Sequence, residues 1–212
     1  RSYLTPAFQK LLANPEAVFS AKETEILKAG QTSTVVSHAL GKQKFVIKRY
    51  NRKGARARLS WRLAHHLHFA GLATAKPIAF IEKHFFGLRR ETYFIMEYVE
   101  GSRADHFFDK EAADSQYLMK TAQSMITLFF NLAKLGLTHG DLKITNILIT
   151  PQHEPVLIDL DGMREHPSPQ GVFRSLNKDL SRFLKNWQDK PDLHALFQGL
   201  IGKMRVANIS SN

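Results

Sequence analysis

Four side chains that could together carry out one reaction follow a histidine–glycine pair in the second half of the chain. The carboxylate of Asp141, the ammonium group of Lys143 and the carboxamide of Asn146 lie at offsets 0, +2 and +5, and Asp159 follows thirteen positions after Asn146. Phosphoryl transfer from a nucleotide needs a carboxylate that takes the hydroxyl proton and a cation that offsets charge on the moving group. It also needs an amide and a second carboxylate that hold magnesium. The residue types and their order therefore predict a phosphotransfer site.

A simpler interpretation applies to the same residues taken singly. Asp and Asn are favoured in turns because their side chains bond to nearby backbone groups, so Asp141 and Asn146 could be turn and cap residues between two strands. The complete set, with Asp159 at the end of an apolar run, favours the chemical interpretation. Asp161 is either a second metal ligand or a structural acid, and the sequence leaves both open.

The elements around these residues would have to bring them together. Residues 147–150 and 156–158 have the composition of two short strands joined by a proline-containing turn. In a hairpin, the residue before the first strand and the residue after the second lie side by side. We therefore expect Asn146 and Asp159 to be neighbours that could share one ion.

The first half of the chain reads mainly as strands. After a lead-in over residues 1–24 with one short amphipathic helix, residues 25–98 show strand alternation interrupted by one helix, at about residues 55–70. Alternation within the third strand places Lys48 on the face opposite Phe45. Residues 99–212 are rich in helical patterns, so the sequence predicts an α+β protein.

A loop with one glycine and several hydroxyl groups separates the first two strands. It contains Gly30, Thr32, Ser33 and Thr34. Hydroxyl and backbone N–H groups of such a loop could bind phosphate, and a plain hairpin turn would have the same composition.

The net charge of +11 is concentrated in the first half of the chain. Residues 26–81 contain eleven Lys and Arg but no Asp or Glu, and the remainder of the chain is neutral. This excess favours an anionic partner, such as a nucleotide, a phosphorylated glycolipid, an anionic membrane or nucleic acid, and a solvated basic face is the simpler alternative. Arg52, Lys53 and Arg56 belong to the densest patch, which we interpret as binding an anionic acceptor. Aromatic residues for base stacking are sparse there, so nucleic acid is not favoured.

Composition excludes several other classes of protein. Without cysteine there are no disulfides and no thiolate chemistry, which suits a reducing compartment. The longest apolar stretch, residues 125–133, is too short to span a bilayer, which needs about 20 apolar residues. The sequence starts at Arg1 rather than methionine, and we expect that an N-terminal piece precedes it.

The stretch His139 to Asn146 and the later Asp159 resemble the H-x-D-x-K-x-x-N and D-F-G motifs of the protein-kinase-like superfamily. The Val46-Ile47-Lys48 run is similar to its V-A-I-K motif. The small size, the I-D-L-D-G form of the second motif and the basic first half most closely resemble the lipopolysaccharide core kinases of Gram-negative bacteria, the Kdo and heptose kinase family. The resemblance implies a bilobal kinase-like fold. Its N-lobe, residues 25–98, would be an antiparallel sheet with one helix, and its compact C-lobe, residues 99–212, would be mainly helical.

The resemblance also implies a function and a role for each residue. ATP with Mg²⁺ would phosphorylate a sugar hydroxyl, of Kdo or heptose, in an anionic glycolipid or phosphosugar acceptor. Asp141 would orient and deprotonate that hydroxyl, and Lys143 would offset charge on the γ-phosphate. Asn146 and Asp159 would bind magnesium, with Asp161 as either a further ligand or a structural acid. Lys48 would contact the α- and β-phosphates, and the Gly30 loop would cover them. The backbone of Glu97 to Val99 would recognise adenine. The protein would be cytoplasmic, with peripheral contact to the anionic inner membrane as an option.

The sequence departs from the kinase pattern at one important place. The helix at residues 55–70 lacks the acid that pairs with the strand lysine in kinases. Either Lys48 pairs with Glu82 or Asp159 instead, or the pair is absent. Two other hypotheses stay open. One is a small RIO-type atypical protein kinase, a class that also pairs H-G-D with a compact C-lobe. The other is a non-catalytic nucleotide-binding pseudokinase, which the missing helix acid favours.

Overall fold

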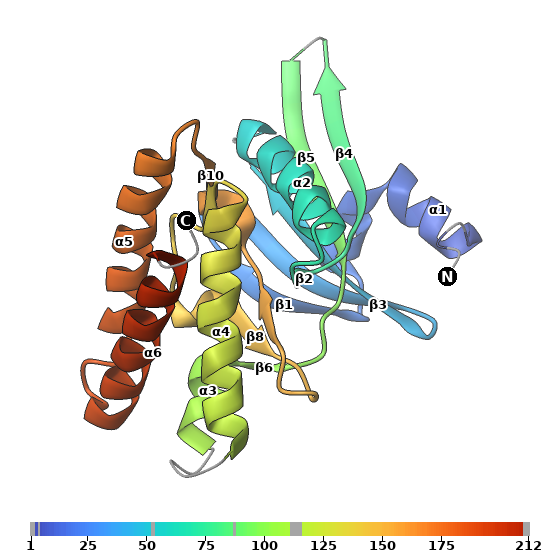
Figure 1. The fold of residues 1–212 in the computed structure, drawn as a ribbon. Helices are drawn as coiled ribbons and strands as arrows, with labels where there is room; N and C mark the ends of the chain where they lie inside the picture. The colour runs from blue at the N-terminus through green and yellow to red at the C-terminus, as the bar shows by residue number, and fades with distance from the viewer. Residues whose placement is uncertain (1–2, 4, 52–53, 87, 111–115, 210–212) are drawn as a thin grey trace. The chain divides into compact units, whose positions relative to one another are not determined.

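The computed structural model describes residues 3, 5–51, 54–86, 88–110 and 116–209. Contacts along the chain divide it into two compact units (Figure 1). The first unit comprises residues 1–66 and 75–98, and the second comprises residues 67–74 and 99–212. Each unit is described by itself below.

The first unit is built on a five-stranded antiparallel sheet in the order β1-β2-β3-β5-β4. Its strands are β1 (Thr24–Ala29), β2 (Ser33–Leu40), β3 (Gln43–Tyr50), β4 (Pro77–Phe85) and β5 (Leu88–Glu97). Directly opposite residues on antiparallel strands share a face. The register pairs Lys48 with Phe94, and Phe94 with Phe80. These three side chains therefore form one row across three strands.

The two faces of this sheet carry different helices. Helix α1 (Pro6–Ala13) and the 3₁₀ helix η1 (Pro15–Ser20) pack on one face. The apolar core there is formed by Phe8, Leu11, Val18, Val36, Phe45, Ile47, Tyr93 and Ile95. On the opposite face, the long helix α2 (Gly54–Phe69) places Trp61 against Phe80 and Phe94, with ring centroids 5.9 and 5.7 Å apart. Lys48 thus lies on the α2 side of the sheet, opposite Phe45 as predicted.

One apolar residue of α2 lies off the buried side of the helix. Leu63 and Leu67, one turn apart, are buried, whereas Phe69 is 93% exposed. Residues at i and i+4 share a helix face, but a residue two positions further on lies well round the helix. Phe69 therefore lies off the buried side of the helix.

Helices form most of the second unit. They are α3 (Ala104–Lys110), α4 (Gln116–Lys134), α5 (Pro169–Lys185) and α6 (Pro191–Ile209), and the last three lie side by side in Figure 1. Helix α5 begins after Ser168, whose hydroxyl accepts the N–H of Gly171, and proline at the first helical position needs no such partner. Aromatic packing between α4, α5 and α6 is centred on Phe183, with Phe129 5.1 Å and Phe197 4.8 Å away between ring centroids.

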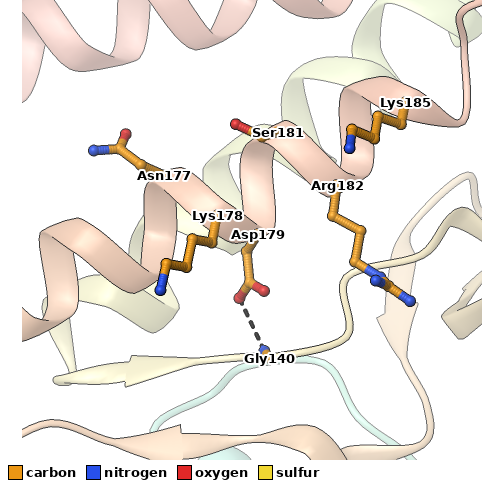
Figure 2. Close-up of a pocket in the computed structure, with 7 residues that line it drawn as sticks. All are labelled: Gly140, Asn177, Lys178, Asp179, Ser181, Arg182 and Lys185. Atoms are coloured by element: carbon orange, nitrogen blue, oxygen red, sulfur yellow. Dashed lines mark hydrogen bonds between the residues drawn. The ribbon is translucent and has the colours of Figure 1, made fainter.

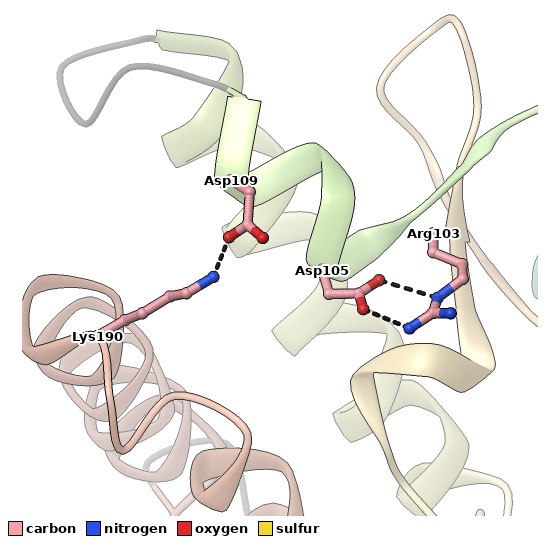
Figure 3. Close-up of polar contacts among 4 residues, drawn as sticks. All are labelled: Arg103, Asp105, Asp109 and Lys190. Atoms are coloured by element: carbon pink, nitrogen blue, oxygen red, sulfur yellow. Dashed lines mark hydrogen bonds and ion pairs between the residues drawn. The ribbon is translucent and has the colours of Figure 1, made fainter.

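Ion pairs also contribute to the packing of the second unit around α3 (Figure 3). Lys190, just before α6, contacts the carboxylate of Asp109 on α3. Arg103 donates to Asp105 through its Nε at 3.1 Å and through a second guanidinium nitrogen. Both pairs are partly exposed, and we expect each to contribute no more than about 1 kcal/mol.

Short strands carry the loops of interest. Strands β6 (Ser102–Arg103), β8 (Ile147–Ile149) and β9 (Pro155–Leu157) form one small sheet, and β7 (Leu137–Thr138) pairs with β10 (Arg164–Glu165). Single 3₁₀ turns, η2 (Ile144–Asn146) and η3 (Leu160–Gly162), lie between them. Over the described part of the chain, helices are too short or too polar to cross a membrane.

Candidate active site

Two loops of the second unit meet backbone to backbone at a pair of glycines. The first loop follows β7 and contains Gly140, and the second follows β9 and contains Gly162. Gly140 has a φ of +73°, and a Cβ atom there would lie 2.0 Å from the carbonyl oxygen of Gly162. A Cβ on Gly162 would in turn lie 3.0 Å from the carbonyl oxygen of His139. No side chain fits at position 140 without moving the second loop, so this glycine fixes how closely the two loops approach.

Short ladders hold the two loops on either side of this contact. The β7–β10 pair aligns Thr138 with Arg164, which are the residues just before the first loop and just after the second. On the other side, the β8–β9 hairpin continues one step further, because the Ile158 N–H donates to the carbonyl of Asn146 at 2.9 Å. The hairpin therefore places Asp159 one residue beyond the partner of Asn146.

Asn146 is oriented by its own loop. Its side-chain N–H donates to the backbone carbonyl of Asp141 at 2.9 Å. The amide nitrogen is thereby committed to the loop, and the oxygen of the same amide is the group that could serve as a metal ligand.

The carboxylate of Asp141 lies between two cations. Arg182 Nη2 of α5 lies 2.6 Å from one carboxylate oxygen, and Lys143 Nζ lies 3.3 Å from the other. The Asp141 side chain is 36% exposed, so it remains accessible to an acceptor from solvent. The structure thus brings the predicted Asp141 and Lys143 together and adds an arginine that the sequence had not indicated.

A buried acid on α5 holds the first loop in place. Asp179 of α5 is 4% exposed and accepts the N–H of Gly140 at 3.0 Å (Figure 2). Burial raises the pKa of Asp179, and the backbone hydrogen bond from Gly140 opposes that rise. We did not predict this residue, although its position gives a signal. Asp179 lies between Leu176 and Leu180 on the apolar side of α5, where an unpaired charge would be costly.

His139 is packed inside the unit rather than exposed to a substrate. It is 1% exposed, and its Nε2 lies 3.4 Å from the carbonyl oxygen of Ile158. Since a carbonyl only accepts, Nε2 carries the proton, and Nδ1 has no hydrogen-bond partner among the described residues. Burial lowers the pKa of His139, so the ring is neutral at neutral pH.

The second acidic loop has an unusual backbone at its first residue. Asp159 has φ 59° and ψ 64°, the left-handed region, which Asp tolerates better than most residues. Asp161 follows inside η3, and both side chains are partly exposed. The left-handed residue turns the chain sharply from β9 into η3 and so redirects it toward the Gly140 contact.

In the first unit, Lys48 is 5% exposed on β3, and its Nζ lies 5.1 Å from the centre of the Tyr50 ring. Glu82, the acid predicted as one possible partner, lies on the same face of the sheet, since it pairs with Thr92 and Thr92 with Tyr50. Both oxygens of Glu82 accept from Arg58 of α2, at 2.8 and 2.5 Å. In the ion pair on this face, helix α2 therefore contributes the cation and strand β4 contributes the carboxylate.

The Gly30 loop is shorter than predicted. Ser33 and Thr34 lie within β2, and only the residues between β1 and β2 form the turn. The Gly30 N–H donates to the carbonyl of Ser33 at 3.0 Å, and Asn51 N donates to the carbonyl of Thr32 at 3.1 Å. These hydrogen bonds close a hairpin turn. Thr32 is exposed in this turn, so its hydroxyl could contact a phosphate.

The remaining predicted positions lie at the end of β5 and on α2. The Glu97 N–H donates to the carbonyl of Lys76 at 2.9 Å and is therefore not available to an adenine. Val99 follows as the first residue of the second unit's longer segment. Arg56 is exposed on α2, and Arg52 and Lys53 lie outside the described residues.

A pocket of about 500 Å³ opens beside the first loop. We refer to it as the α5 pocket. It is lined by Gly140, Asn177, Lys178, Asp179, Ser181, Arg182 and Lys185. In Figure 2, Lys178 and Arg182 extend to either side of Asp179, toward the segment that carries Gly140.

An antiparallel sheet unit, a mainly helical unit and this pair of loops define a bilobal, protein-kinase-like fold, as predicted. The family model described as the lipopolysaccharide kinase (Kdo/WaaP) family matches residues 31–200, and the chain belongs to this family. It is thus a phosphotransferase with an alcohol-group acceptor that acts on the lipopolysaccharide core. No curated protein matches the chain.

Proposed function

We propose that the protein transfers the γ-phosphoryl group of ATP to a hydroxyl of Kdo or heptose in the lipopolysaccharide inner core. The observation that carries this proposal is the arrangement around Asp141, which combines a partly exposed carboxylate, the Lys143 ammonium at 3.3 Å and the Asn146 amide on the same loop. The family supplies the class of acceptor. The finer choice between Kdo and heptose is part of the proposal.

Asp141 would orient the acceptor hydroxyl and take its proton. A general base must come within about 2.6–3.2 Å of the group that it deprotonates. The exposed part of the Asp141 carboxylate permits that approach, and its bonds to two cations hold its position. Lys143 would then offset negative charge on the phosphoryl group as it moves.

Asn146 and Asp159 would hold Mg²⁺, with Asp161 as a further candidate. Magnesium commonly uses one or two protein oxygens together with substrate phosphates, so a dedicated protein cage is not needed. The described residues contain no cluster of three His, Cys, Asp or Glu side chains that could hold a metal ion. When bound, the ion would neutralise charge on the phosphates of ATP.

Residues of the first unit would bind the nucleotide. The buried ammonium of Lys48 would contact the α- and β-phosphates, and the hydroxyls of Thr32 and Thr34 would cover them. The carbonyl of Glu97 and the backbone of Val99 would recognise adenine. The acceptor would be an anionic glycolipid or phosphosugar, for which Arg56 remains a candidate contact.

The test is mass spectrometry of defined acceptors after incubation with the protein, ATP and Mg²⁺. One acceptor carries Kdo alone on lipid A, and the other carries heptose as well. Gain of one phosphoryl group on either glycolipid supports the proposal, and fragmentation identifies the sugar. Phosphorylation of protein substrates alone would support the RIO-type alternative, and nucleotide binding without any transfer would support a pseudokinase.

A further inference from the structure

We propose that the α5 pocket binds the anionic group, a carboxylate or a phosphate, of the acceptor sugar. This inference rests on the proposed function for the identity of the acceptor. It assigns recognition of this anionic group to α5, in the second unit, and leaves Arg56 of α2 as a separate candidate contact.

The first argument is the charge of the pocket. Lys178, Arg182 and Lys185 contribute three cations from one side of α5. The acid in its lining, Asp179, accepts the Gly140 N–H, and Arg182 contacts the Asp141 carboxylate beside the pocket. Within the described part of the chain, neither Lys178 nor Lys185 forms an ion pair. An anion entering here would therefore meet two lysines whose charge no acid of the described residues cancels, beside an arginine that is shared with Asp141.

The second argument is the arrangement of donors. Lys178 and Arg182 are four residues apart and so lie on the same face of α5, and Lys185 follows one turn later. Asn177 also lines the pocket, and its side chain is held in place because Arg205 of α6 donates to its oxygen at 2.6 Å. Guanidinium, ammonium, hydroxyl and amide groups around one space are the donors that carboxylates and phosphates accept from.

The third argument is the position of the pocket relative to the proposed base. Arg182 lines the pocket and also lies 2.6 Å from the Asp141 carboxylate. An acidic sugar anchored by this arginine would hold its neighbouring hydroxyls close to Asp141. Pockets of about 300–1,000 Å³ accommodate small ligands, and the α5 pocket has space for one sugar with its charged substituent.

The experiment measures binding of soluble acceptor fragments to the full chain by calorimetry in the absence of ATP. A Kdo glycoside is compared with its carboxyl methyl ester, and a heptose phosphate is compared with the free heptose. Wild-type protein should bind at least one of the charged fragments about tenfold or more tightly than its neutral counterpart. The pair that shows this preference identifies the anion as carboxylate or phosphate.

The test variant is the double substitution Lys178→Ala with Lys185→Ala, because neither lysine contacts Asp141. It should lose the preference for the charged fragment while binding the neutral one as before. Arg174→Ala is the matched control, since it removes an exposed cation of α5 outside the pocket, and it should keep the preference.

Equal binding of charged and neutral fragments by wild-type protein, no binding of either, or an unchanged preference in the double variant would each overturn the assignment. Phosphoryl transfer is measured separately on the same proteins. Absence of transfer with the preference intact would contradict the proposed function and not the pocket. Transfer without any preference would contradict only the pocket.

Discussion

At the scale of single residues, the site depends on backbone placement as much as on the charged side chains. Gly140 and Asp159 both have left-handed backbone conformations, and each stands at the start of one of the two loops. The glycine lets the loops approach, and the aspartate turns the second loop toward the first. Charged groups such as Asp141 can be found by motif, but their mutual distances are set by these backbone positions.

Substituting Gly140 by alanine should destabilise the protein and abolish transfer. The left-handed φ alone costs about 1–2 kcal/mol, and the clash with the Gly162 carbonyl adds to it. Gly71→Ala is the matched control, since Gly71 has a φ of +71° but open space around its Cβ position. Chemical denaturation should show a clearly larger loss for position 140, and equal losses would mean that the second loop yields freely.

Buried His139 should make the protein sensitive to mild acid. Burial lowers its pKa from the ordinary histidine value of 6.5, so the unfolded chain takes up a proton more readily than the folded one. Its contribution to stability is therefore complete above the unfolded pKa and is lost as the pH falls through the folded pKa.

Unfolding free energies at about pH 7.5 and about pH 5.5 test this expectation. Wild-type protein should lose about 1 kcal/mol more than His139→Gln between the two values. The comparison with the variant cancels the other titrating groups, among them His38, whose pKa burial also lowers. An equal pH dependence of the two proteins would show that His139 does not contribute.

At the scale of secondary-structure elements, periodicity predicted much of the framework. The helix predicted at about residues 55–70 is Gly54–Phe69, and the strands predicted at residues 147–150 and 156–158 are Ile147–Ile149 and Pro155–Leu157. The alternation of side chains along the third strand also correctly predicted that Lys48 lies on the face of the sheet opposite Phe45. These features depend on local patterns, which the order of residues records directly.

Contacts between distant elements could not be predicted in the same way. Asp179 and Arg182 reach the loop of Gly140 and Asp141 from a helix about forty residues later in the chain, and only the packing of α5 brings them there. The ion pair of Arg58 with Glu82 was missed for the same reason. A helical pattern identifies which residues share a face, but it does not identify the loop or strand against which that face packs.

Helix α5 should act on catalysis through the bond from Gly140 to Asp179. Asp179→Ala leaves the buried N–H without an acceptor, at a cost of about 1–3 kcal/mol, whereas Asp179→Asn retains an oxygen that can accept it. We expect transfer to fall much more in the alanine variant, with the asparagine variant closer to wild type. Equal rates for the two variants would show that the hydrogen bond does not position the loop.

At the scale of the whole molecule, the uneven charge should govern encounters with anionic surfaces. The excess of eleven positive charges lies within residues 26–81, which include Lys42 and Arg56 as exposed residues. Attraction of basic residues to an anionic membrane is worth about 1 kcal/mol for each Lys or Arg near the surface and weakens with salt.

Vesicle sedimentation can measure this effect. The protein should bind vesicles containing phosphatidylglycerol more tightly than neutral phosphatidylcholine vesicles, and salt should weaken the binding. Arg56→Gln should weaken it by about fivefold, whereas Lys203→Gln on α6 should have little effect. Equal effects of the two substitutions would place the contact elsewhere or make it non-specific.

The central claim is that Asp141 serves as the base of a phosphoryl transfer to a core sugar. The most direct test is transfer of the γ-phosphoryl group of labelled ATP to the Kdo- and heptose-bearing glycolipids, measured for wild type, Asp141→Asn and the exposed control Asp189→Asn. The account predicts labelled glycolipid with wild type and control, and a rate lower by at least about a hundredfold with Asp141→Asn, whose melting curve should remain that of a folded protein. Transfer by folded Asp141→Asn at the wild-type rate would contradict it.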